Sequence, residues 1–186
     1  MKVLGIHGSP RQGGNTELLV REALAGAEAQ GATTEFVSLN DLTIRGCQAC
    51  MYCRAHDGCA VQDDMQAIYV QIAEADAIVL GSPVYMHGVT GQTKIFIDRL
   101  YPYLNSDFTS KVQKPTLFIV TQGNPNMQEF ATAMQITANV LGVLGFPVQE
   151  TLTVAAGMGK GAVAEKIEEC ARVYQAGAQL VHHNNS

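Results

Sequence analysis

The chain has 186 residues, of which 47% are hydrophobic and 16% are charged, and its formal net charge is −5 at pH 7. This composition excludes a disordered chain and predicts one globular domain, residues 1–186, with a core of its own. The acidic balance argues against nucleic acid as a partner, because a phosphate-binding surface usually carries an excess of Lys and Arg. The apolar start, MKVLGIHG, is too short for a signal peptide or a membrane span. We therefore expect no membrane partner and a cytoplasmic location.

Short apolar runs alternate with amphipathic stretches along the whole chain. The apolar runs predict five strands, at residues 2–8, 33–39, 76–82, 115–123 and 147–155. The amphipathic stretches predict helices that begin after GGNT and continue through Leu24, and then at 63–75, 91–101, 127–144 and 160–182. Asp63 or Asp64 is the expected N-cap of the second helix, and Pro102 disturbs the end of the third.

Continuous apolar strands separated by helices indicate an α/β fold with a parallel sheet covered on both faces. Five such strands and right-handed crossovers are typical of the doubly wound, flavodoxin-like order 2-1-3-4-5. In these sheets a ligand binds beyond the carboxyl ends of the strands, at the switch point between strands 1 and 3. The loops after strands 1, 3 and 4 are therefore expected to carry the chemistry.

The loop after the first strand, HGSPRQGGNTELL, leads into a helix through small and polar residues. N–H groups at a helix N-terminus bind anions, and Ser9, Asn15, Thr16 and the charged Arg11 add donors suited to a phosphate. An ordinary turn capped by Asn15 or Thr16 is the alternative. The loop lacks the Gly-Lys-Ser/Thr step of a Walker A nucleotide site and the G-x-G-x-x-G spacing of a dinucleotide site. A ligand that ends in a monophosphate, such as FMN, is therefore the better candidate.

The loops after strands 3 and 4 have the composition of a flavin edge. In GSPVYMHG, residues 81–88, Gly81 and Gly88 allow the backbone to approach a planar ring, and Val84 and Tyr85 offer apolar surface. The alternative is a tight turn with Tyr85 in the core. TQGNPN, residues 121–126, would close the same pocket, although alone it also fits a generic turn.

Two of these segments carry a family resemblance. GSPRQGGNT and GSPVYMHGVTGQTKIFIDR resemble the NADPH-dependent FMN reductase group of flavodoxin-like proteins, and the resemblance continues through nearly the whole chain. It implies that the FMN phosphate is held by Ser9, Arg11, Asn15 and Thr16. For the rest of the cofactor it implies contacts from Pro83, Val84 and Tyr85, with Gly88, Thr121 and Gly123 completing the predicted site.

Four of the five cysteines lie close together in GCQACMYCRAHDGC, at the start of a cysteine-rich loop, residues 46–62. The spacing Cys47-x2-Cys50-x2-Cys53-x5-Cys59 fits a cubane iron–sulfur cluster. The alternatives are a zinc site, with four of these cysteines or three and His56, free thiols or a labile disulfide without metal, and coincidence. Without a bound centre, residues 45–62 are expected to be poorly ordered. Cys170 lies on an amphipathic stretch and is expected in the core.

The compact cysteine motif after the second strand resembles that of the iron–sulfur flavoproteins. This resemblance implies FMN and one [4Fe–4S] cluster per chain, a ferredoxin-type electron donor, and a homodimer or homotetramer in which the cluster faces a neighbour's flavin. The expected function is an FMN-dependent oxidoreductase that relays electrons between that donor, FMN and a small acceptor. The alternatives are a cluster-free NAD(P)H-dependent FMN or quinone reductase, a pure electron carrier and a zinc-stabilised binding module.

Overall fold

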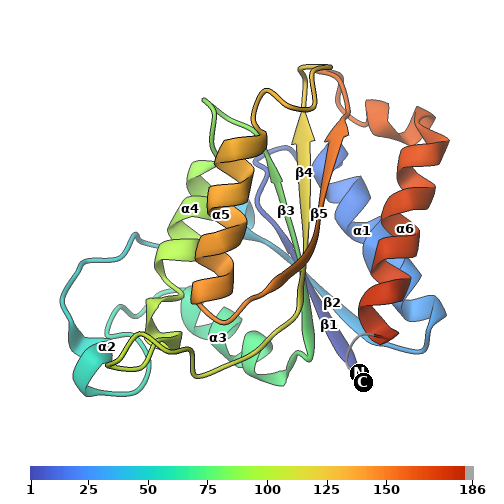
Figure 1. The fold of residues 1–186 in the computed structure, drawn as a ribbon. Coiled ribbons are helices and arrows are strands. Elements are labelled where there is room, and N and C mark those ends of the chain that lie inside the picture. The colour runs from blue at the N-terminus through green and yellow to red at the C-terminus, as the bar shows by residue number, and fades with distance from the viewer. Residues whose placement is uncertain (183–186) are drawn as a thin grey trace.

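The computed structural model describes residues 1–182, which fold around one twisted parallel sheet (Figure 1). Its strands are β1 (Lys2–His7), β2 (Thr33–Ser38), β3 (Ala77–Pro83), β4 (Thr116–Gln122) and β5 (Val148–Ala155). All neighbouring strands pair in parallel, and their order is β2-β1-β3-β4-β5. This confirms the flavodoxin-like α/β fold and its strand order.

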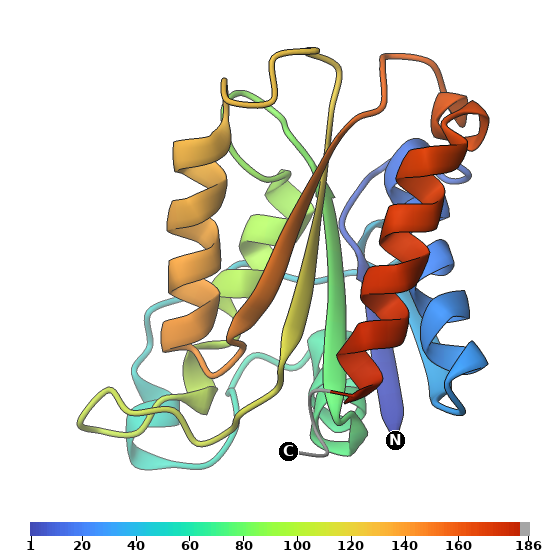
Figure 2. The same ribbon diagram turned by 45° about the vertical axis from the view of Figure 1, so that its right-hand side comes forward.

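Helices cover both faces of the sheet, as Figures 1 and 2 show. α1 (Asn15–Ala29) and α6 (Ile167–His182) pack on one face, and α3 (Met65–Glu74), α4 (Gly91–Asp98) and α5 (Ala131–Val143) pack on the other. α2 (Tyr52–Ala55) is a single turn within the cysteine-rich loop. Successive residues of a strand face opposite sides, so Val79 belongs to the core under α1 and α6 and Leu80 to the core under α3, α4 and α5.

Several helices begin or end away from their predicted bounds. α5 begins at Ala131 rather than at 127, because Asn124 and Asn126 accept backbone N–H groups two residues on and hold a turn there. α6 begins at Ile167 rather than at 160, after the 3₁₀ turn η3 (Ala162–Glu165). The helix predicted for 91–101 ends as α4 at Asp98, and η2 (Tyr101–Tyr103) forms around Pro102.

The structure confirms an aspartate at the N-cap of α3, but a different aspartate makes the side-chain bond to the helix. Asp64 occupies the N-cap position but its side chain makes no capping bond to the helix, and the Met65 N–H instead donates to the Asp63 carboxylate at 3.1 Å. Asp63 is also the partner of a buried arginine, Arg99, which follows α4. A tertiary ion pair therefore fixes the start of this helix.

The segment after β2 runs from one end of α4 to the other. Asn40, in the 3₁₀ turn η1 (Leu39–Asp41), accepts a hydrogen bond from Gln92 in the first turn of α4, whereas the Arg45 carbonyl accepts one from Arg99 just beyond its last turn. The cysteine-rich loop consequently lies at the lower left of Figure 1, away from the edge where the strands end. None of the helices within residues 1–182 has the length and apolar character that a membrane crossing requires.

Candidate functional site

A cavity of about 380 Å³ opens at the carboxyl ends of the strands. Four loops line it, those after β1, β3, β4 and β5. The lining residues are Ser9, Arg11, Asn15, Thr16, Pro83, Val84, Tyr85, Met86, Thr121, Gln122, Gly123, Gly157 and Met158. The structure thus brings together every predicted contact of the phosphate and ring loops except Gly88.

Gly88 closes the turn after β3 instead of lining the cavity. Its N–H donates to the Tyr85 carbonyl at 3.0 Å and its carbonyl accepts the Tyr85 N–H at 2.8 Å. Between them, Met86 and His87 have φ angles of 47° and 63°, in the left-handed region. The turn presents Met86, which is 99% exposed, at the mouth of the cavity.

Hydroxyl groups form the floor of the cavity. Ser9, Thr16 and Thr121 are buried, and the Thr16 and Thr121 hydroxyl oxygens lie 2.7 Å apart. The Ser9 Oγ accepts the Arg11 N–H at 3.1 Å. A hydroxyl that accepts one hydrogen bond still has a proton to donate, so Ser9 and one of the two threonines retain donors for an anionic ligand.

Arg11 and Asn15 are tied to the loop after β5. The Asn15 side-chain amide donates to the Gly159 carbonyl at 3.0 Å, and its oxygen accepts the Val163 N–H at 3.1 Å. One Arg11 Nη donates to the Met158 carbonyl at 3.1 Å, which leaves further guanidinium N–H groups for a ligand. Asn15 therefore positions the loop after β5, and it also lines the cavity in which it is predicted to contact the phosphate.

α1 begins beside the cavity. The N–H groups of its first turn have no carbonyl partners within the helix, because no helical turn precedes them. One nearby donor is taken, because the Glu17 carboxylate accepts the Gly13 N–H at 2.7 Å. Burial alone would raise the pKa of Glu17, but the Gly13 N–H and Arg21 outweigh it and hold that pKa below its ordinary value. Glu17 is thus ionised at neutral pH.

Sequence reasoning missed Met86, Gln122, Gly157 and Met158. Gln122 donates its side-chain amide to the Asn124 and Asn126 carbonyls and so shapes the loop after β4. Gly157 and Met158 lie in the loop that begins where β5 ends at Ala155, and the carboxyl ends of all parallel strands meet at the same edge. The rule that all parallel strands end at one edge could have drawn attention to AAGMGKG at 155–161. The residue types in this segment do not themselves indicate binding of a phosphate or a flavin.

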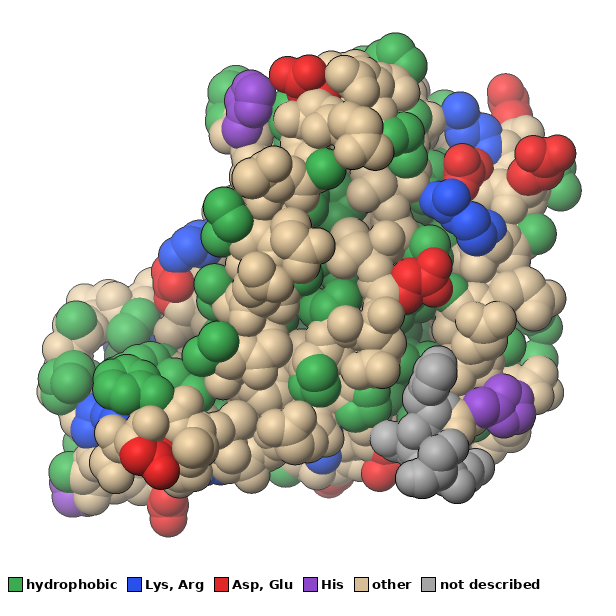
Figure 3. Space-filling model, in the orientation of Figure 1, with side chains coloured by type: hydrophobic (Ala, Val, Ile, Leu, Met, Phe, Trp, Pro, Cys, Tyr) green, Lys and Arg blue, Asp and Glu red, His purple; other side chains and the backbone are tan. Residues whose placement is uncertain are grey.

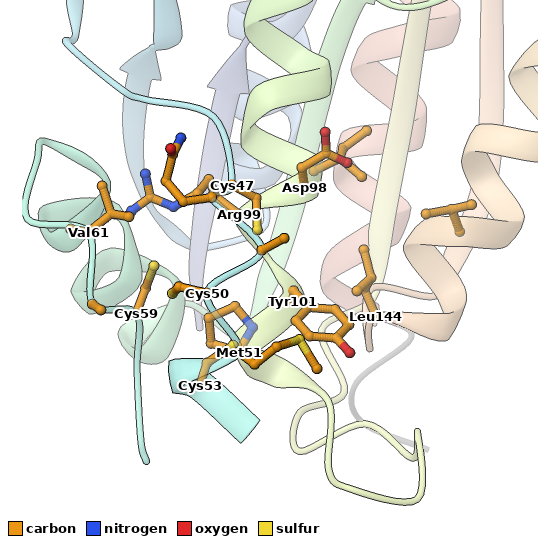
Figure 4. Close-up of a pocket in the computed structure, with 16 residues that line it drawn as sticks. Cys47, Cys50, Met51, Cys53, Cys59, Val61, Asp98, Arg99, Tyr101 and Leu144 are labelled. Carbon is orange, nitrogen blue, oxygen red and sulfur yellow. The ribbon is translucent and has the colours of Figure 1, made fainter. Parts of the chain in front are cut away.

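A second pocket, of about 390 Å³, lies beyond the C-terminal end of α4 and contains all four clustered cysteines. Its walls are formed by the loop itself, by Val140 and Leu144 of the α5 end, and by residues 97–99, 101 and 102 (Figure 4). Burial raises the pKa of the Cys53 thiol, and the neighbouring Cys59, Cys47 and Cys50 raise it further. Soft thiol donors around one hollow suit an iron–sulfur or zinc centre.

The thiols share this pocket without forming a ligand shell. Among residues 1–182, no three His, Cys, Asp or Glu side chains converge in an arrangement that could hold a metal ion. All five cysteines are free, and Cys170 packs beside the core under α1 and α6, where its Sγ lies 3.4 Å from the Val163 carbonyl. The donor set fits a metal centre, while the placement of the sulfurs does not by itself define one.

Comparison with known proteins gives consistent matches. The family model described as NADPH-dependent FMN reductase matches residues 1–161. An iron–sulfur flavoprotein of Methanocaldococcus jannaschii is 49% identical over 102 residues, which are 55% of this chain and 53% of that protein. One from Archaeoglobus fulgidus is 34% identical over 140 residues, 75% of this chain and 71% of that protein. The chain spans about half the length of several of these relatives.

The solved structures agree on the fold. An NAD(P)H:quinone oxidoreductase from Methanothermobacter marburgensis superposes with a TM-score of 0.72 and 18% identity, over 97% of this chain and 98% of that one. A structure titled flavone reductase gives a TM-score of 0.75 with 21% identity, over 98% of this chain and 62% of that one.

Proposed function

Because this chain belongs to the NADPH-dependent FMN reductase family and to its iron–sulfur flavoprotein subgroup, we propose that it is an FMN-dependent oxidoreductase. The observation that carries the proposal is the four-loop cavity at the switch point of the sheet. It combines a polar floor beside a helix N-terminus with an apolar mouth, and FMN has a phosphate at one end and a planar ring at the other.

The phosphate end is assigned to the loop after β1. Arg11 contributes a positive charge, the Ser9 hydroxyl contributes a proton, and the N-terminus of α1 contributes its dipole. Thr16 and Thr121 share a hydrogen bond, so one of them donates to the ligand. Asn15 acts indirectly, by holding Gly157 and Met158 against the same space.

The ring end is assigned to the mouth of the cavity, where Pro83, Val84, Tyr85, Met86 and Met158 provide apolar surface. Bound FMN would supply two-electron chemistry and would exchange electrons singly with other carriers. The protein's part is to orient the ring and to limit access of water. Gly123 lets the loop after β4 lie close to Met158, because a Cβ at this position would lie only 2.3 Å from the Met158 sulfur.

We assign a [4Fe–4S] cluster to Cys47, Cys50, Cys53 and Cys59. All four line one pocket, their spacing suits a single cluster, and the relatives named iron–sulfur flavoproteins support the assignment. Such a group would supply one-electron transfer, with a ferredoxin-type protein as donor and a small molecule as final acceptor. Clustered thiols of this kind persist in a reducing compartment, which supports a cytoplasmic location.

The two pockets lie at opposite ends of α4. Its eight residues rise about 1.5 Å each, so the helix alone separates the flavin edge from the cysteine pocket by about 12 Å. An assembly of two or four copies would offer the cysteine pocket a neighbour's flavin edge. Exposed apolar side chains beside both pockets, among them Met51, Val140 and Met86, support such a homo-oligomer.

A cluster-free NAD(P)H-dependent FMN or quinone reductase is the second candidate function. The scattered placement of the cysteine sulfurs favours it, because no three ligand side chains converge among residues 1–182. The cysteines would then serve as free thiols. The flavin cavity is common to both candidates.

Anaerobic purification followed by visible spectroscopy and by iron and acid-labile sulfide analysis separates the two. The leading proposal predicts bound FMN, iron and sulfide in a ratio near that of one cluster per flavin, and efficient turnover with reduced ferredoxin. FMN without iron or sulfide, together with efficient NADPH oxidation, establishes the second candidate. A protein that binds no FMN overturns both.

The phosphate assignment is tested by replacing Arg11 with Met. Loss of one charged phosphate contact is expected to weaken FMN binding about 10- to 100-fold, since a charge-assisted bond contributes about 1.5–3 kcal/mol. Arg172→Met is the matched control, because Arg172 is an exposed arginine of α6 that bonds the Thr153 carbonyl outside the cavity. Equal FMN dissociation constants for the two variants would contradict the assignment.

A further inference from the structure

Arg99, the residue after α4, is 1% exposed although it carries a full positive charge. Its guanidinium pairs with the Asp63 carboxylate through two bonds, of 2.7 and 3.1 Å. The pair belongs neither to the sheet core nor to the flavin cavity, but Arg99 lines the cysteine pocket. A buried charge must be satisfied by specific partners, so the remaining contacts of Arg99 indicate what it is for.

Those contacts join the two ends of the cysteine-rich loop. One Nη donates to the Arg45 carbonyl at 2.8 Å, two residues before Cys47, and the other donates to the Val61 carbonyl at 3.3 Å, two residues after Cys59. The backbone on both sides of the four cysteines is thus bound by the same guanidinium. Figure 4 shows Arg99 reaching toward Val61 beside the cysteines.

Further bonds reinforce the same junction. The Asp63 carboxylate also accepts the Arg45 N–H at 2.9 Å, which ties the outgoing and returning segments directly. The Gln66 side chain donates to the Val61 carbonyl at 2.7 Å. On the other side, the Tyr69 hydroxyl donates to the Arg99 carbonyl at 2.5 Å and anchors the arginine's own backbone to α3.

We propose that Arg99 is the positioning residue of the four-cysteine loop: its buried guanidinium clamps the residues before Cys47 and after Cys59 and holds the loop in shape through protein contacts alone. The proposal deepens the assignment of a metal centre to these cysteines and rests on it for its functional meaning. It replaces the expectation that residues 45–62 need a bound centre for order. The planar guanidinium is essential to this role, because its several N–H donors bond the Asp63 carboxylate and the Arg45 and Val61 carbonyls at the same time.

The test uses metal-free full-length protein and amide hydrogen exchange, so that it does not depend on any cofactor. In Arg99→Met, the hydrogen-bonded amides of the loop and its junction, those of Arg45, Arg54 and His56, should exchange at least about 10-fold faster than in the wild type, while those of β3 and β4 change by less than about twofold. Arg99→Lys keeps the charge but loses the fork, and should restore little of the protection. Unchanged exchange in Arg99→Met, or full protection in Arg99→Lys, would overturn the proposal.

Two further variants separate positioning from general destabilisation. Leu100→Ala truncates the fully buried neighbour of Arg99 and lowers global stability without touching the clamp. If Leu100→Ala loosens the loop as much as Arg99→Met does, the role of Arg99 is merely structural and the proposal fails. Should Arg99→Met not fold, Asp63→Asn removes the charged partner with little change of shape and must give the same local increase in exchange.

Iron and sulfide uptake then links the clamp to the cysteine site. After anaerobic reconstitution, Arg99→Met and Asp63→Asn should retain FMN but hold at least about 10-fold less cluster. A loss of this size is usual when residues that position the ligands of a metal site are removed. Normal cluster content in Arg99→Met would count against the proposal. Absence of cluster from the wild type would defeat the [4Fe–4S] assignment, while the exchange result would still decide whether Arg99 holds the loop.

Discussion

Gly8 lies where the loop after β1 meets the start of α4. The Thr90 hydroxyl donates to the Gly8 carbonyl at 2.5 Å, and the Gly8 N–H donates to the Gly81 carbonyl at 2.8 Å. A Cβ at Gly8 would lie 1.9 Å from the Thr93 Oγ1, which is itself hydrogen-bonded to Thr90. The absence of a side chain at this one residue allows β1, β3 and α4 to approach and form the switch point.

Gly8→Ala is therefore expected to destabilise the fold by about 1–3 kcal/mol through overpacking and to weaken FMN binding. Chemical denaturation and an FMN titration measure the two effects. Gly91→Ala is the control, because a Cβ at Gly91, the first residue of α4, meets open space and should change stability by less than about 0.5 kcal/mol. Equal stability of the two variants would show that the switch point tolerates a side chain.

The ionised state of Asp63 contributes stability that depends on pH. Burial alone would raise the pKa of Asp63, but Arg99 and the N–H groups of Arg45 and Met65 outweigh it and hold that pKa below its ordinary value. A carboxyl with a lowered folded pKa stabilises the fold above the unfolded pKa, about 3.9, and this contribution disappears as pH falls through the folded value.

The free energy of unfolding of wild type and Asp63→Asn, compared across pH, tests this linkage. At pH 6–7 the wild type should be more stable by about 3 kcal/mol, because the variant leaves a buried guanidinium without its counter-charge. Below about pH 4 the difference should shrink, since the wild-type carboxyl also becomes neutral. A difference that stays constant down to the acid transition would mean that the charge of Asp63 does not stabilise the pair.

At the scale of elements, the loop between β5 and α6 depends on one side chain of α1. The Asn15 amide joins the start of α1 to the Gly157, Gly159 and Val163 backbone across more than 140 residues of sequence. This loop supplies Gly157 and Met158 to the flavin cavity. A side chain of α1 thus holds the fourth wall of the candidate site, and the first turn of the same helix carries the N–H groups proposed to face the phosphate.

Asn15→Ala is expected to lose about 1–3 kcal/mol of stability and to weaken FMN binding, because several hydrogen bonds to the loop disappear together. Hydrogen exchange localised to residues 156–163, with an FMN titration, measures the effect. Asn139→Ala is the matched control, since Asn139 is an exposed residue of α5 whose side chain accepts only from Gln135 among the described hydrogen bonds. FMN affinity unchanged in Asn15→Ala would assign the fourth wall to other contacts.

At the scale of the whole molecule, sequence periodicity was sufficient for the sheet and for one side of the site. Runs such as residues 77–83 are apolar on both faces, as a parallel strand covered by helices on both sides requires. Because parallel strands end at the same edge, the loops that follow them bring Ser9, Tyr85 and Thr121 together. Tertiary contacts decided the rest. No local pattern links Asn15 to the loop after β5, more than 140 residues away, and none links Arg99 to Asp63, 36 residues away.

The same limit applies to the position of the cysteine-rich loop. Its motif predicts a centre held by thiols, yet the motif does not indicate which end of α4 the loop occupies. That position depends on Arg99, Tyr69 and the α5 end, which the sequence places far from the cysteines. The result is a molecule with the candidate flavin cavity at one end and the thiol pocket at the other, and the proposed homo-oligomer turns attention to the surface beside the thiol pocket.

That surface includes an apolar stripe on the outer face of α5. Ile136, Val140 and Val143 are 59%, 43% and 59% exposed, and their spacing of four and three residues places them on one side of the helix. Figure 3 shows hydrophobic side chains over α5 and over the neighbouring part of the molecule that contains α2. Contiguous exposed apolar side chains of this kind are typical of an interface.

The proposed homo-oligomer predicts that replacing both Val140 and Val143 with Glu gives a smaller species, since each copy would then place charges in the contact between subunits. Sedimentation velocity measures the change, and FMN binding should persist because the cavity lies at the opposite end of the sheet. Gln135→Glu with Asn139→Asp adds the same charge to the polar side of α5 and should leave assembly intact. An unchanged sedimentation coefficient in the valine variant would place the interface elsewhere. A smaller species that also loses electron transfer from reduced ferredoxin to FMN would support a route between neighbouring subunits.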